Sequence, residues 1–202
     1  MLTLNKFAGF SNMLCAVLLS LSWFSIGIFM WDEISTGNFL AMVQNPAWIP
    51  VNIFYLIATI LLIPGIIALY VKQAEKSGTL GLTAFMITIL AIIWYVCIQF
   101  YETFFWPIIA TESPLLFKEV GFFPSNNIIY LQLMLSAIPW ATGFILLGIV
   151  TIKKQLIAKW TVWVFTIGAL LFGVGMMFPI RSIGVILFSY GLVKYGNTLR
   201  KV

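Results

Sequence analysis

The sequence WIPVNIFYLIATILLIPGIIALYV, residues 48–71, contains no charged residue and is followed directly by the basic segment KQAEKSG, residues 72–78. A helix of about 20 apolar residues crosses the roughly 30 Å hydrocarbon core of a bilayer. Lipid offers no hydrogen-bond partners, so a spanning segment has to satisfy its own backbone groups, and a helix does this. We therefore predict that residues 48–71 form a transmembrane helix.

Stretches of the same kind fill almost all of the 202 residues. Hydrophobic residues make up 62% of the chain and charged residues only 8%, whereas a typical soluble domain has about 25% charged residues. We predict an all-α, polytopic membrane protein in which residues 1–202 form a single domain, a bundle of six transmembrane helices. The predicted spans are Phe7–Met30, Trp48–Val71, Thr79–Phe104, Asn127–Val150, Ala158–Met177 and Ile180–Lys194.

The positively charged residues gather on one side of the membrane if these six spans alternate in direction. Of the 11 lysines and arginines, only Lys118 and Arg181 fall on the opposite side. The others are Lys6, Lys72, Lys76, Lys153, Lys154, Lys159, Lys194, Arg200 and Lys201. Because loops rich in lysine and arginine stay in the cytoplasm, we predict that both termini are cytoplasmic.

This charge distribution has consequences for location and partners. The general shape is similar to that of small six-span bacterial membrane proteins, so we expect a multi-pass protein of the cell membrane, such as the bacterial inner membrane. The basic cytoplasmic rim should attract anionic lipid headgroups. The net charge of +5 follows the predicted topology and does not form one soluble basic face, so it does not indicate binding to nucleic acid.

Two parts of the chain share a sequence pattern. NIFYL at residues 52–56 is followed by Ile63 and Pro64, and NIIYL at residues 127–131 is followed by Ile138 and Pro139. The pattern predicts a parallel repeat of a helical hairpin, formed by spans two and three and by spans four and five. The alternative is chance similarity between apolar sequences. The two prolines are expected to kink equivalent helices, either as hinges or as static features that improve packing.

Polar groups inside the predicted spans are the candidate site residues, because burying an ionisable group in a membrane is costly. Glu102 and Arg181 are placed by their depth near the outer boundary, either as a charge pair or separately solvated at the interface. Asn52 and Asn127 are expected to cap helices. Gln99 and Gln132 lie deeper and need partners, either on another helix or on a polar ligand. Tyr101 completes the polar set.

The sequence argues against several classes of function. It contains no histidine, which excludes histidine-ligated haem and most zinc sites. It also has no glycine-rich phosphate loop and no paired carboxylates within the spans. We therefore predict no catalytic residue, metal or cofactor, and favour a non-enzymatic protein.

Two hypotheses about function remain open. The favoured one is that the polar set lines an outward-facing intramembrane pocket that binds or transports a small, largely apolar molecule. In the alternative, the chain is an accessory, sensor or immunity-type membrane protein that acts through contacts with a protein partner of unknown identity, and the polar residues are only structural.

Overall fold

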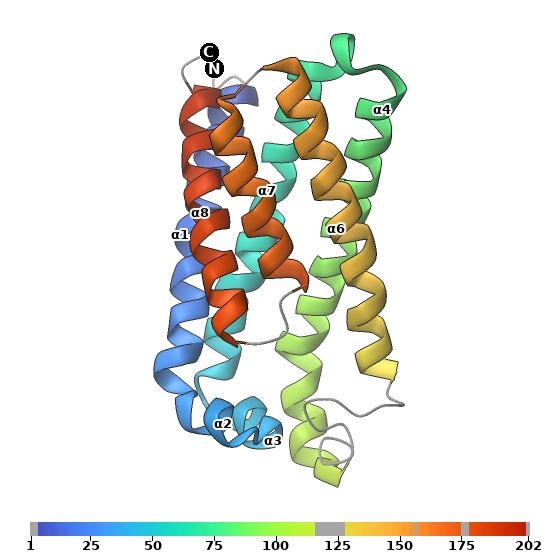
Figure 1. Ribbon diagram of the computed structural model, residues 1–202. Helices are drawn as coiled ribbons and strands as arrows, with labels where there is room; N and C mark the ends of the chain where they lie inside the picture. Colours follow the sequence, from blue (N-terminus) through green and yellow to red (C-terminus); the bar gives the residue numbers. More distant parts are fainter. Residues whose placement is uncertain (1–3, 116–127, 156, 175–177, 201–202) are drawn as a thin grey trace.

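The computed structural model describes residues 4–115, 128–155, 157–174 and 178–200, without the side chains of residues 128–134, 174 and 178. Within these ranges every secondary-structure element is an α-helix, which confirms the predicted all-α class (Figure 1). The long helices are α1 (Leu4–Phe29), α4 (Trp48–Glu112), α6 (Ile128–Lys154), α7 (Lys159–Val174) and α8 (Phe178–Arg200). Two short helices, α2 (Trp31–Thr36) and α3 (Phe39–Gln44), connect α1 to α4.

The longest helix, α4, folds back on itself at Gly78. This glycine has φ 57° and ψ −152°, a conformation that is readily available only to a residue without a Cβ atom. Ring contacts pair the two halves in antiparallel register. Tyr70 stacks on Phe85 near the turn, and Trp48 stacks on Trp106 far from it. α4 is therefore a helical hairpin with a first half (residues 48–77) and a second half (residues 79–112), which lie side by side in Figure 1.

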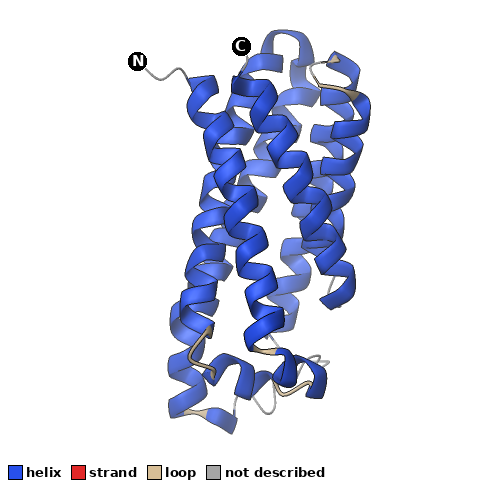
Figure 2. Ribbon diagram, turned by 90° about the vertical axis from the view of Figure 1, so that its left-hand side faces the viewer, coloured by secondary structure: helices blue, strands red, loops and turns tan. Residues whose placement is uncertain are grey.

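The long helices form a ring. α1 packs against α4 on one side and α8 on the other, α8 packs against α7, and α6 lies between α7 and α4. The first half of α4 faces α1, because Ser11 and Ser22 donate hydrogen bonds to the carbonyl oxygens of Leu61 and Val51. Figures 1 and 2 show the two chain ends at the same end of the bundle as the α4 turn. We call this the lysine end, and the opposite end, beside α2 and α3, the cap end.

Aromatic side chains fill the middle of the bundle. Trp140, Phe144, Phe172 and Phe188 are at most 2% exposed, and their rings lie within 4.8–6.4 Å of one another in successive pairs. Such rings bury large apolar areas and contribute about 0.5–1.5 kcal/mol per favourable pair beyond that burial. The interior of the ring is thus packed with side chains.

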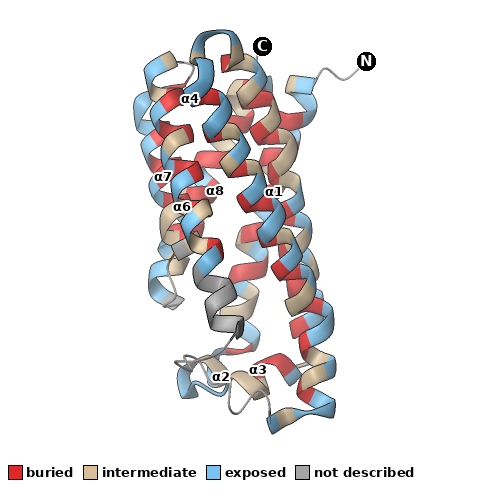
Figure 3. Ribbon diagram, turned by 90° about the vertical axis from the view of Figure 1, so that its right-hand side faces the viewer, coloured by how far each residue is buried: buried red, intermediate tan, exposed pale blue. Residues whose placement is uncertain are grey.

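The outer surface of the bundle is also apolar. Large hydrophobic side chains such as Phe10 (57% exposed), Ile28 (72%) and Ile138 (65%) point away from the interior, and Figure 3 shows exposed positions along the outside of the helices. Three of the described helices are long and apolar enough to cross a membrane: α1, α4 and the Leu135–Lys154 part of α6. α7 contributes a shorter apolar helix. Large exposed apolar areas are rare in soluble monomers, so these features support a membrane protein.

Several helix boundaries differ from the predicted spans. The basic segment between spans two and three was predicted as a loop, but α4 stays helical up to the turn at Gly78. Lys, Gln, Ala and Glu are good helix formers, so the helix continues beyond its apolar part. The third predicted span ended at Phe104, whereas α4 continues through Pro107 to Glu112.

The last helix also begins earlier than predicted. α8 begins at Phe178 and includes Pro179, which lies between the fifth and sixth predicted spans, and it continues to Arg200. Proline is tolerated in the first turn of a helix, where the missing N–H would have no partner in the helix. The loop predicted between spans one and two contains α2 and α3.

The two predicted kink positions, Pro64 and Pro139, both lie inside helices. Within α4 the residue with non-helical torsion angles is Gly78, so the helical path continues through Pro64. The turn after α6 also contains a residue with positive φ, Gln155 at 53°. The predicted hairpin repeat stays a prediction.

Candidate functional site

Arg181, in the first turn of α8, lies among side chains from three other helices. Its Nη2 donates hydrogen bonds to the hydroxyl of Tyr55, at 2.8 Å, and to the hydroxyl of Tyr95. Its guanidinium carbon lies 5.0 Å from the ring centroid of Trp23 and 5.1 Å from that of Phe172. The tyrosines come from the two halves of α4, Trp23 from α1 and Phe172 from α7. The fold thus brings four helices together around one cation.

These neighbours replace much of the water that a guanidinium would otherwise need. A cation over an aromatic face gains about 0.5–2 kcal/mol, with the larger values at desolvated sites. Counting about 1.5 Å per residue from Trp48 puts Tyr55, and with it Arg181, about 10 Å inside the bundle from the cap end. Arg181 is therefore enclosed by side chains of the bundle.

Glu102 contributes the negative charge near this site. Its Oε2 accepts a hydrogen bond from Nε2 of Gln99 at 2.8 Å, and its carboxyl group interacts electrostatically with Arg181. Within the described residues no ion pair of 4 Å or less joins Glu102 to Arg181. The charge pair considered from the sequence is therefore indirect, because tyrosine and glutamine side chains make the hydrogen bonds of the two charged groups.

Two buried polar atoms of this site have no hydrogen-bond partner among the described residues. They are the Nε of Arg181, a donor, and the Oε1 of Gln99, an acceptor. Gln99 is 2% exposed and lies one helical turn beyond Tyr95, on the same face of α4. Leaving a buried polar atom unpaired costs about 1–3 kcal/mol. An acceptor would satisfy the first atom and a donor the second. We call Arg181, Tyr55, Tyr95, Gln99 and Glu102 the Arg181 site.

The remaining predicted residues make other contacts or lie outside the described residues. Asn52 is 3% exposed and donates from Nδ2 to the carbonyl oxygen of Trp48. It lies in the second turn of α4, so it does not cap the helix as predicted. Tyr101 stacks on Phe105 at 5.6 Å and packs with the residues near the cap end. Asn127 and the side chain of Gln132 lie outside the described residues.

The sequence analysis missed the aromatic members of the site. Tyr55, Tyr95 and Trp23 lie in apolar spans, where aromatic residues usually serve packing or interface anchoring. One sequence signal points to them in retrospect. An arginine inside a membrane needs acceptors and ring faces, and both tyrosines lie in the outer halves of their predicted spans. The sequence did not reveal which tyrosine meets Arg181, because that depends on how the helices are rotated.

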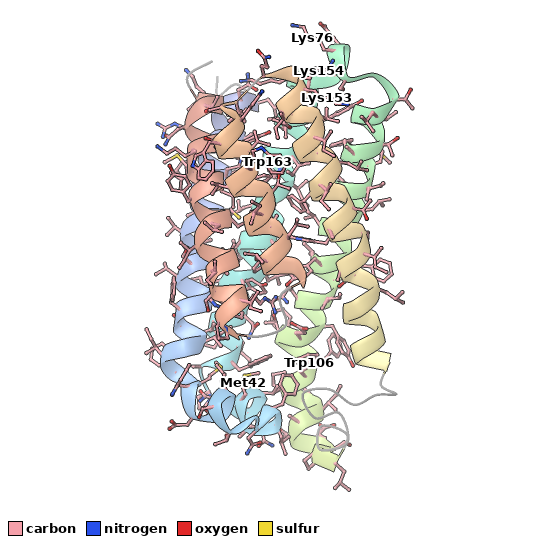
Figure 4. All side chains as sticks on the ribbon, in the orientation of Figure 1. Met42, Lys76, Trp106, Lys153, Lys154 and Trp163 are labelled. Carbon is pink, nitrogen blue, oxygen red and sulfur yellow. The ribbon has the colours of Figure 1, made fainter. Side chains whose placement is uncertain are left out.

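The cap end is closed by α2 and α3. Gln44 at the end of α3 donates from Nε2 to the carbonyl oxygen of Ala110, at 2.8 Å. Met42 of α3 packs with Trp48 and Trp106 in a second apolar cluster, and Figure 4 shows Met42 and Trp106 close to each other at this end. The short helices are therefore fixed to α4 at the cap end of the bundle.

No group of three or more His, Cys, Asp or Glu side chains among the described residues could hold a metal ion. Comparison with family models, with curated proteins and with solved structures found no match to the chain.

Proposed function

We propose that the chain is an integral protein of the cell membrane that crosses the bilayer six times. α1 and α6 have 26 and 27 residues, and α4 with 65 residues is long enough for two crossings. α7 and α8, with 16 and 23 residues, form the last two spans. The apolar outer surface of these helices supports this arrangement.

The lysine end faces the cytoplasm in this proposal. Lys76, Lys153 and Lys154 gather there (Figure 4), and lysine-rich segments stay cytoplasmic. The same residues would attract anionic lipid headgroups. A reporter domain fused to the carboxyl terminus tests the orientation, because it should remain inside the cell. Export of the reporter would contradict the proposed topology.

Within this topology, the proposed function is non-enzymatic binding of a small, largely apolar molecule that carries one hydrogen-bonding group. The observation that supports it is the pair of buried, unpartnered atoms, Nε of Arg181 and Oε1 of Gln99. A hydroxyl group could accept from the first and donate to the second. The rings of Trp23 and Phe172 are next to the guanidinium and offer apolar contact to the rest of the molecule. Transport would require the aromatic interior to open.

The proposal is testable with two compounds of similar shape, benzyl alcohol and toluene. A ligand at ten times its Kd stabilises the folded state by about 1.4 kcal/mol. We expect benzyl alcohol to raise the unfolding temperature of the detergent-purified protein more than toluene does, because only the alcohol can bond both atoms. The difference should disappear in the Gln99→Leu variant.

Gln73→Leu is the matched control, because Gln73 is another buried glutamine of α4 with one unpartnered atom, far from Arg181. It should keep the difference between the two compounds. If the alcohol and toluene act equally on the unaltered protein, or if both glutamine variants lose the effect, the Arg181 site does not bind such a ligand.

A second candidate function follows from the packed interior. Trp140, Phe144 and Phe188 are at most 1% exposed, so a protein that acts only through its surface, as an accessory or sensor membrane protein with a protein partner, also fits this bundle. In that case the Arg181 site is structural. The partner and its binding surface stay open, and the benzyl alcohol experiment separates the two functions.

A further inference from the structure

A second group of buried polar side chains lies close to the lysine end. Gln73, in the first half of α4, is 0% exposed, and its Oε1 accepts a hydrogen bond from Oγ1 of Thr151 in α6 at 3.4 Å. Thr166 of α7 is 5% exposed. A Cβ atom built on Gly148 would lie only 2.4 Å from Oγ1 of Thr166, and Gly148 is one turn before Thr151 on the same face of α6. Gln73 and Thr151 thus join α4 to α6, and Thr166 of α7 packs against α6 one turn away. We call these three residues the lysine-end cluster.

This cluster has unused hydrogen-bond donors. Nε2 of Gln73 and Oγ1 of Thr166 are both buried without a partner among the described residues. The hydroxyl of Thr151 has a single hydrogen, which it donates to the carbonyl oxygen of Leu147 at 2.8 Å and shares with the Oε1 of Gln73 at 3.4 Å. The remaining Gln73 nitrogen can only donate, and the Thr166 hydroxyl can donate as well. The group that would satisfy them is therefore an acceptor.

Two lysines lie one turn beyond the cluster toward the lysine end. Lys76 follows Gln73 by three residues and Lys154 follows Thr151 by three residues, so each shares a helix face with a member of the cluster. Neither lysine has an ion pair among the described residues, and Figure 4 shows both at the same end of the bundle. The nearest acidic residue in sequence, Glu75, is exposed and lies on another face of α4.

From this arrangement we propose that the lysine-end cluster binds a phosphate or similar oxyanion, which accepts hydrogen bonds from Gln73 and Thr166 and lies under the ammonium groups of Lys76 and Lys154. Charge-assisted hydrogen bonds of this kind are stronger than neutral ones. The anion comes either from the headgroup of an anionic lipid or from a free phosphate compound in the cytoplasm. The site rests on the proposed orientation of the lysine end, and it does not need a ligand in the Arg181 site.

The first experiment measures lipid retention. The protein is purified in neutral detergent, phosphatidylglycerol or phosphatidylcholine is added, and the bound lipid is counted by native mass spectrometry. We expect preferential retention of phosphatidylglycerol, reduced at least tenfold by Gln73→Leu, Thr166→Val or Lys154→Gln. Lys153→Gln is the matched control for charge. Lys153 is exposed and lies on a different face of α6 from Thr151, so this variant should retain the lipid.

The second experiment uses inorganic phosphate without added lipid. Stabilisation by phosphate, compared with chloride at equal ionic strength, would identify a free anion as the source, provided that the same three variants remove it. Gln73→Leu should still fold, because the buried amide that it removes has one long hydrogen bond and an unpaired nitrogen, and its unfolding temperature without ligand checks this.

Two results would overturn the proposal. In the first, all variants behave like the unaltered protein in both experiments, which would mean that neither the lipid nor phosphate binds to the cluster. In the second, Lys153→Gln weakens retention as much as Lys154→Gln while Gln73→Leu has no effect, which indicates unspecific attraction by the lysine rim. Gln99→Leu should leave both readouts unchanged, so failure here is distinguishable from failure of the Arg181 site.

Discussion

The hydroxyl groups of Tyr55 and Tyr95 lie 2.9 Å apart, and both accept a hydrogen bond from the same nitrogen of Arg181. This contact joins the two halves of the α4 hairpin to the start of α8. It places a cation within an apolar bundle, where a charged side chain is stable only with partners from the protein.

We predict that the two tyrosines support Arg181 jointly. Tyr55→Phe or Tyr95→Phe alone should reduce the free energy of unfolding by about 1–2 kcal/mol, because the other hydroxyl still accepts from Arg181. The double variant should lose more than the sum of the two, since the guanidinium then has no acceptor. Chemical unfolding in detergent measures these values. Tyr70→Phe, at the ring pair near Gly78, is the control and should have a small effect. Strict additivity would show that the hydroxyls act independently.

Glu102 and Arg181 should be coupled although no ion pair joins them. Glu102→Gln and Arg181→Gln are each expected to lower stability, because each leaves the opposite charge inside the bundle without compensation. The double variant should be more stable than the sum of the single effects predicts, by about 0.5–2 kcal/mol. A double-mutant cycle on the unfolding free energy measures the coupling. A double variant that loses the full sum would mean that the two charges are screened from each other.

The two turns at the lysine end should respond in opposite directions to changes of glycine. Gly78→Ala places a Cβ atom at φ 57° and should destabilise the protein by about 1–2 kcal/mol. Gln155→Gly removes the Cβ atom from a residue at φ 53° and should be neutral or stabilising by up to about 1 kcal/mol. Nothing lies within 4 Å of the Cβ position of Gly78, so a loss of stability there reports backbone strain alone. An unchanged unfolding temperature in Gly78→Ala would contradict the observed turn.

Close packing of α7 against α8 depends on a glycine. A Cβ atom on Gly184 would lie 2.4 Å from the backbone nitrogen of Phe172, so Gly184→Ala forces the helices apart and should cost about 1–3 kcal/mol. The matched control is Gly148→Ala, which meets the side chain of Thr166 and requires a smaller adjustment. Thermal unfolding of both variants should rank Gly184→Ala as the more damaging. The reverse order would contradict the close approach of the two backbones at Gly184.

Much of the fold was predictable because it depends on local sequence. The uncharged stretch at residues 48–71 predicted its helix, and the glycine at the end of KQAEKSG lies where the chain reverses. The helix limits were less predictable, because Lys, Gln and Ala continue a helix past the apolar run and proline is tolerated in a first turn, as at Pro179. The sequence did not predict α2 and α3, because short helices at the end of a bundle do not contain a long stretch of apolar residues.

The candidate site was predictable only in part. Gln99, Glu102 and Arg181 stood out because polar groups in apolar spans are rare, and the structure places all three in one region. Asn52 and Tyr101 stood out for the same reason. In the structure, however, Asn52 bonds to the backbone of α4 and Tyr101 stacks on a neighbouring ring of the same helix. Polarity and depth do not tell which way a side chain faces. The sequence therefore could not separate the residues of the Arg181 site from the other polar residues in the predicted spans.

The sequence by itself therefore determined the all-helical class of the protein, the apolar stretches that form its long helices and the end of the bundle at which the lysines gather, because these follow from residues close together in the chain. Only the tertiary structure decided that Tyr55 and Tyr95 hold Arg181 and that Gln73 reaches Thr151. The physical reason is that such contacts depend on the rotation of each helix about its axis, which is set by the packing of all its neighbours at once.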